Sequence, residues 1–171
     1  MFSLITLSLF AILMLWAAYS DLTSYTLSNR LCLAVALLYP LYLLALYLEG
    51  NVLIWSDILM TVGFAAVLFI IGAILFAFNV MGGGDVKLIP AVALWAGTGH
   101  ILNYLFITAL IGGAIAAIII VHKHIKASKY FKSSENINLP MAEKDDSAVP
   151  YGAGIAGGGL YVAYQLLPSM T

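Results

Sequence analysis

Two aspartates are the residues of this sequence whose type and setting are best suited to chemistry. Asp21 directly follows a long apolar run, and Asp85 closes a run of three glycines. A charged side chain at membrane depth is costly, so it needs a functional reason. Both aspartates fall at ends of predicted helices that lie on the same side of the membrane. We therefore expect two acids more than sixty residues apart in the sequence to meet at one depth.

Such a pair predicts hydrolysis by an activated water. Two carboxylates held close together cannot both ionise, so one keeps a proton while the other stays charged. The charged one can take a proton from water as it attacks an amide carbonyl. The protonated one can hydrogen-bond the carbonyl oxygen and later protonate the leaving nitrogen. The pair titrates as a unit, so the sequence does not assign acid and base. This chemistry requires no metal and no cofactor.

The residues around the aspartates are candidates for holding a substrate. A triple glycine permits backbone conformations that are closed to other residues, and an extended peptide could dock beside it. A flexible hinge would use the same three glycines. Lys87 could pair with Asp85 or a substrate, or extend to the interface. Asn29 could orient groups near Asp21, or cap a helix. The expected substrate-binding residues are Gly82, Gly83, Gly84, Lys87 and Asn29.

Composition places these residues in a membrane protein. Of the 171 residues, 63% are hydrophobic and 9% are charged, whereas a soluble domain has about 25% charged residues. The formal net charge of −1 gives no reason to expect nucleic acid as a partner. The only cysteine, Cys32, excludes a disulfide framework and a cysteine-based zinc site, and we expect a small core residue there.

The hydropathy pattern predicts an all-α, polytopic transmembrane bundle of about six segments. A span needs about 20 apolar residues. The fourth run is short and is followed by the glycine-rich breaker at 97–99, and the sixth has the close-packing pattern Gly154-xxx-Gly158. The three tryptophans and the tyrosines lie mostly near predicted span ends, as in an interfacial aromatic belt. The six runs are Phe2–Tyr19, Leu31–Leu48, Ile58–Phe78, Val86–Ala96, Ile101–Val121 and Gly152–Leu167.

The basic residues predict the orientation. Alternating spans place three connections on one side, and these hold every lysine and the arginine: Arg30, Lys87, Lys123, Lys126, Lys129, Lys132 and Lys144. By the positive-inside rule that face is cytoplasmic. Glu49 and Asp57 fall on the opposite face, where we expect them at the water boundary. We expect one membrane-embedded domain over residues 1–171, with a polar cytoplasmic loop at 122–151.

Three strings of the sequence resemble one family. The string Gly82-Gly83-Gly84-Asp85-Val86-Lys87-Leu88 resembles the second aspartate motif of type IV prepilin peptidases, which are GxGD aspartic proteases. Asp21 followed by Leu27-Ser28-Asn29 is similar to the first motif, with Ser28 where the family has proline. Val149-Pro150-Tyr151-Gly152 resembles the family's Pro-Tyr-Gly at the last helix. The resemblance spans roughly residues 10 to 165.

The resemblance implies an aspartic endopeptidase of the cell (inner, cytoplasmic) membrane with Asp21 and Asp85 as catalytic residues. Its substrates would be prepilins and pseudopilins, cut at the cytoplasmic face, with the pilus assembly machinery and the lipid bilayer as surroundings. The chain lacks the paired CxxC motifs of the large methylating members, so it resembles the short, peptidase-only branch associated with tight-adherence (Flp) pili. Two alternatives stay open: a GxGD protease for another membrane substrate such as preflagellin, and a small ion-coupled transporter.

Overall fold

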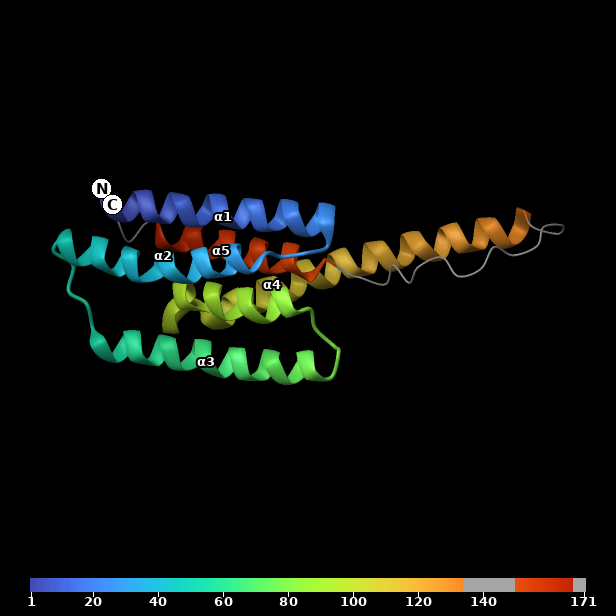
Figure 1. Ribbon diagram of the computed structural model, residues 1–171. Helices are drawn as coiled ribbons and strands as arrows, with labels where there is room; N and C mark the ends of the chain where they lie inside the picture. Colours follow the sequence, from blue (N-terminus) through green and yellow to red (C-terminus); the bar gives the residue numbers. More distant parts are fainter. Residues whose placement is uncertain (134–149, 168–171) are drawn as a thin grey trace.

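The computed structural model describes the backbone of residues 1–133 and 150–167, and the side chains of 1–122 and 150–167. Every regular element in this part of the chain is a helix (Figure 1), so the all-α prediction is confirmed. The helices are α1 (Phe2–Ser24), α2 (Asn29–Leu48), α3 (Trp55–Ala77), α4 (Gly83–Ser133) and α5 (Tyr151–Leu166).

Judged by length and composition, fewer of the described helices could cross a membrane than the six spans that the sequence predicts. Within the described residues, four helices are long and apolar enough to cross a membrane: α1, α2, α3 and α4 as far as His122. Helix α5 has 16 residues, which gives a length of about 24 Å against a hydrocarbon core of about 30 Å. The expected fourth and fifth runs belong to one element, α4. Six spans are therefore not confirmed.

Helix α4 is broken at Gly97 and folds back on itself. Gly97 has φ 60° and ψ −176°, a conformation that other residues rarely adopt, at the breaker expected from the sequence. The Tyr104 hydroxyl donates a hydrogen bond to the Ile89 carbonyl at 3.2 Å. In a straight helix, residues fifteen apart would lie about 22 Å from each other. The two halves of α4 therefore pack side by side.

This hairpin brings several helix ends to one end of the bundle. Figure 1 shows that α1 ends there and that α4 and α5 begin there. The second half of α4 extends beyond the bundle at the same end and continues to Ser133. The expected loop 122–151 is therefore wrong for residues 122–133, because that stretch contains no proline or glycine to end the helix. Residues 134–149 of this loop lie outside the described residues.

Helix α5 packs closely against its neighbours through glycines. A Cβ placed on Gly154 would lie 2.8 Å from the Cα of Gly112, and one on Gly158 would lie 2.2 Å from the Thr108 hydroxyl oxygen. No side chain fits at these separations. The close packing predicted from the spacing of Gly154 and Gly158 is confirmed, and it places α5 against α4 and α1.

Trp95 anchors the middle of the bundle and does not lie at an interface. Its side chain is 2% exposed, and its ring stacks on Phe10 with 4.2 Å between centroids. The indole N–H donates to the Val35 carbonyl at 3.0 Å. The aromatic-belt prediction is wrong for this tryptophan, because α4 turns back at Gly97 and carries Trp95 inside. Cys32 is buried, as expected.

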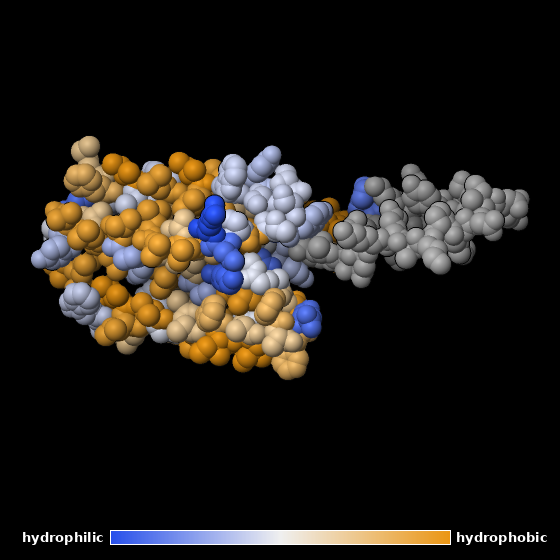
Figure 2. All heavy atoms as spheres, in the orientation of Figure 1, coloured by the Kyte–Doolittle hydropathy of each residue, from blue (hydrophilic) through white to orange (hydrophobic). Residues whose placement is uncertain are grey.

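The outside of the bundle is apolar. Many large hydrophobic side chains of α1, α2 and α3 are exposed, and Figure 2 shows them (orange) over much of one face, with hydrophilic residues (blue) in small patches. In water such a surface would aggregate, whereas in lipid it needs no further partner. The chain is therefore a multi-pass membrane protein.

Candidate active site

Asp21 lies in the last turn of α1, and its side chain is bound by another segment, the start of α5. Helix α1 ends at Ser24, and the next residue, Tyr25, has the left-handed φ of 51° and donates its N–H to the Asp21 carbonyl at 3.0 Å. The Asp21 side chain is 5% exposed. Its carboxylate accepts a hydrogen bond from the Ala153 backbone N–H at 2.9 Å. A residue of α1 therefore binds the first turn of α5.

Asp85 lies in the first turn of α4, where the three glycines pass into the helix. Its side chain is 8% exposed. A Cβ on Gly82 would lie 3.1 Å from the Asp85 carboxylate oxygen, so the glycine leaves room for that group. Within the described residues, no hydrogen bond to the Asp85 carboxylate is present. It lies close enough to Asp21 for the two carboxylates to repel each other.

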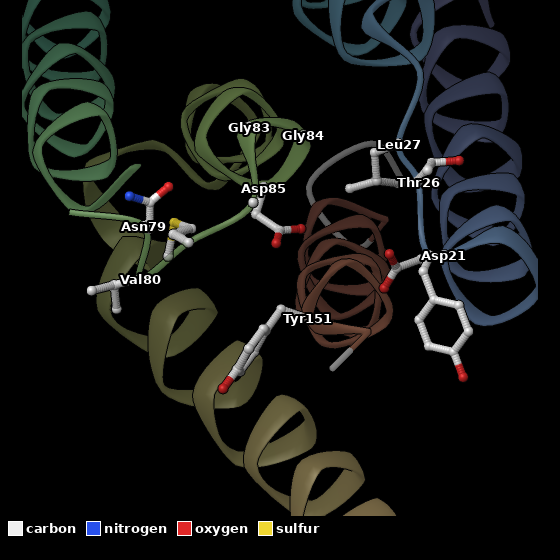
Figure 3. A pocket seen from close by; sticks show the side chains of 12 residues that line it. Asp21, Thr26, Leu27, Asn79, Val80, Gly83, Gly84, Asp85 and Tyr151 are labelled. Carbon is white, nitrogen blue, oxygen red and sulfur yellow. The ribbon is translucent and has the colours of Figure 1, made fainter. Parts of the chain in front are cut away.

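Both aspartates line one cavity of about 620 Å³ at the end of the bundle where α4 and α5 begin. In Figure 3 the two carboxylates point toward each other from opposite sides, with the start of α5 between them in this view. The lining residues are Asp21, Tyr25, Thr26, Leu27, Asn79, Val80, Met81, Gly82, Gly83, Gly84, Asp85 and Tyr151. The cavity therefore collects residues from both sequence motifs and from the start of the last helix.

Leu27 packs into the narrow space between the starts of α4 and α5. A Cβ on Gly84 would lie 2.7 Å from the Leu27 Cβ, and one on Gly152 would lie 2.8 Å from the Leu27 Cδ1. The same Cβ on Gly152 would lie 2.7 Å from the Asp21 Cγ. Glycine at both positions thus allows the α1–α2 connection to reach the site.

Lys87 and Asn29 bind each other and do not line the cavity. The Lys87 ammonium donates to the Asn29 side-chain oxygen at 2.7 Å, which joins the start of α4 to the start of α2. Ser28, which stands where the family that the sequence resembles has proline, accepts a hydrogen bond from the Leu31 N–H at 3.2 Å and caps α2. A direct role of Lys87 and Asn29 in substrate binding stays a prediction.

The cavity offers carboxylates, hydroxyls and backbone groups for chemistry. In the described part of the chain, no group of three or more His, Cys, Asp or Glu side chains is placed to hold a metal ion. Two buried acids that line one cavity can hydrogen-bond a water and a carbonyl group. This is the arrangement that acid–base hydrolysis of an amide needs.

Several cavity residues were not among the expected site residues. Tyr25, Thr26 and Leu27 lie within six residues after Asp21 in the first aspartate motif, while Asn79, Val80 and Met81 directly precede the glycines. Their position next to the motifs was an available signal. The backbone N–H of Ala153, by contrast, has no signature in a sequence.

Fold and cavity together define a membrane-embedded protein with an acid-lined site at one end of a helical bundle. Residues 8–117 match the type IV leader peptidase family. Because this match covers more than half of the chain, the protein belongs to that family and is a peptidase, a hydrolase of protein substrates. Neither a curated protein nor a solved structure matches the chain.

Proposed function

We propose that the protein is an aspartic endopeptidase that removes the leader peptide of type IV prepilins and pseudopilins at the cytoplasmic membrane face. Asp21 and Asp85 are the catalytic residues, and Gly82–Gly84 admit the substrate backbone. Flp-type substrates and peptidase activity without methylation are part of this proposal, because these 171 residues contain a single cysteine and therefore no paired CxxC motifs.

One observation carries this proposal. Two buried aspartates, from helices that start far apart in the sequence, line a single cavity beside three consecutive glycines. A membrane bundle rarely keeps two acids in such a place without a function. The family match includes both of them, since it runs from residue 8 to 117.

The chemistry follows from the two carboxylates. The charged carboxylate takes a proton from water while the water oxygen bonds to the amide carbon. The protonated carboxylate hydrogen-bonds the carbonyl oxygen during this step. The tetrahedral intermediate then breaks its C–N bond, and the nitrogen takes a proton from the acid. The products are a free carboxylate on the leader and a free amine on the pilin.

The basic residues support the cytoplasmic side for this reaction. Arg30 and Lys87 lie at the starts of α2 and α4, and the part of α4 that extends past the bundle carries four further lysines in sequence. All of these helix segments belong to the end that holds the cavity (Figure 1). The positive-inside rule then orients the cavity toward the cytoplasm.

The test is cleavage of a prepilin by purified protein in lipid vesicles. Asp21→Asn and Asp85→Asn should each reduce kcat/KM by at least about 1,000-fold, because each removes a proton-transfer group that the other cannot replace. Both variants should insert as the wild type does. Asp57→Asn, in the first turn of α3, is the matched control and should cleave normally. Normal processing by either cavity variant would refute the mechanism.

A further inference from the structure

The start of α5 has a cap that comes from another helix. Its own N-cap residue, Pro150, offers no side-chain hydrogen bond. The Asp21 carboxylate fills this role by accepting the Ala153 N–H at 2.9 Å, and the adjacent Gly152 amide also interacts with it. The contact joins residues 132 positions apart in the sequence, and it lies beside the cavity. Asp21 is thus fixed by the backbone of the last helix.

The Ala153 N–H can donate to Asp21 without giving up a hydrogen bond inside α5. Ala153 is the third residue of α5, and the first four N–H groups of a helix have no partner inside it. A carboxylate that accepts such an N–H is favoured in its charged form, both by the hydrogen bond and by the positive end of the helix dipole. The contact therefore acts on the charge of Asp21 as well as on its position.

Asp85 differs in this respect. It also lies in the first turn of a helix, yet in the described part of the chain its carboxylate accepts no backbone N–H. The two acids repel each other, so only one of them is ionised. The ionised one is the carboxyl group that accepts more hydrogen bonds from N–H donors. The other titratable side chains that line the cavity are Tyr25 and Tyr151, and the nearby Lys87 is bonded to Asn29. Among the residues that the structure describes, no basic side chain lines the cavity to reverse this preference.

We propose that the first-turn amides of α5 are a positioning element that holds Asp21 charged, which makes Asp21 the general base and Asp85 the proton-bearing partner. This rests on the proposed function and assigns the two roles that the sequence leaves open. The proposal also assigns a role to the segment Pro150-Tyr151-Gly152. This segment starts α5 where its amides reach Asp21, and glycine at position 152 leaves room for that carboxylate.

The first experiment removes the amide and keeps the acid. Ala153→Pro deletes the N–H without breaking a hydrogen bond inside α5, because the first four N–H groups of a helix have no partner within it. With the charged form of Asp21 less favoured, kcat should fall about 10- to 100-fold and the acidic limb of the pH–rate profile should move up by roughly one to two pH units. KM should change little. The conservative variant Ala153→Gly retains the N–H and should keep the acidic limb at the wild-type pH.

A second variant displaces the carboxylate from the amide. A Cβ on Gly152 would lie 2.7 Å from the Asp21 Cγ, whereas one on Gly113 would have open space. Gly152→Ala should therefore lower kcat and move the acidic limb in the same direction. Gly113→Ala is the matched control and should behave as the wild type.

Three outcomes would overturn the inference. The first is an unmoved acidic limb in Ala153→Pro or Gly152→Ala. The second is an Ala153→Pro protein that fails to insert while Ala153→Gly inserts, which would show that the amide serves folding. The third is an acidic limb moved equally by Ala153→Gly. In each case wild-type cleavage, with loss of activity in the two Asp→Asn variants, would leave the proposed function standing; without that pattern the proposed function itself fails.

Discussion

The starts of α1 and α5 lack a side-chain cap of their own, and an acidic side chain from another segment of the chain caps each of them. At one end of the bundle, Glu49 follows α2 and binds the start of α1, where it accepts the Ser3 N–H at 3.0 Å and also the Ser3 hydroxyl. At the other end, Asp21 of α1 binds the start of α5 through the Ala153 N–H at 2.9 Å. The same physical interaction is used twice.

The surroundings of the two acids differ. Glu49 also pairs with the terminal ammonium, so its charge is neutralised by a partner. Asp21 is nearly fully buried, faces a second acid, and lines a cavity that also contains three consecutive glycines. The comparison teaches that an acid at a helix start is a structural device by itself. The second acid and the open space make the Asp21 end a candidate site.

Of the variants that test the difference between the two ends of the bundle, a glycine variant at the Asp21 end should lower activity most. Gly84→Ala would place a Cβ 2.7 Å from the Leu27 Cβ, so the α1–α2 connection must shift beside Asp85. We expect kcat/KM to fall about 10- to 100-fold, since small displacements of reacting groups cost that much. Cleavage assays in vesicles measure it.

Gly63→Ala is the control for this variant, because a Cβ there meets nothing within 4 Å. It should cleave normally and be slightly more stable, since alanine favours a helix over glycine. Full activity of Gly84→Ala would contradict the importance of this close approach.

A smaller effect, on stability alone, is expected at the other end. Hydrogen bonds from the terminal ammonium and from Ser3 lower the pKa of Glu49 from 4.5 to about 2. A lowered pKa in the folded state means that the stabilisation is present above pH about 4.5 and is lost as pH falls toward about 2. Glu49→Gln should remove this part of the pH dependence of Tm and leave cleavage at neutral pH unchanged. A cleavage defect in Glu49→Gln would break the distinction between the two ends.

The sequence predicts the parts of the site that depend on side-chain type. The apolar runs predict the helices, and Asp21 and Asp85 stand out by their charge. The glycine-rich stretch 97–99 predicts the break at Gly97. It does not predict contacts made by backbone groups across the fold, such as Ala153 N–H with Asp21, because any residue offers that donor. The contact of Glu49 is likewise not predicted. Hydropathy indicates only a position at the water boundary, whereas in the fold Glu49 accepts hydrogen bonds from Ser3.

Two expectations fail for different reasons. The sequence predicts Trp95 at an interface because each apolar run is treated as a separate span, whereas the return of α4 at Gly97 carries this side chain into the bundle. Polar composition predicts a loop from residue 122, yet residues 122–133 continue α4 past the bundle. Packing between helices decides the first case, and a single run of sequence does not contain it. The second case is local, because the stretch contains no proline or glycine to end the helix.

The central claim is that Asp21 and Asp85 act on the same reaction centre. The most direct measurement is the affinity of a leader peptide whose scissile amide is replaced by a hydroxyl-bearing tetrahedral isostere. A mimic of the intermediate should bind the wild type at least about 100-fold tighter than the unmodified peptide. Asp21→Asn and Asp85→Asn should each abolish that preference, while both still bind the unmodified peptide. An isostere preference that survives in either variant would contradict the account.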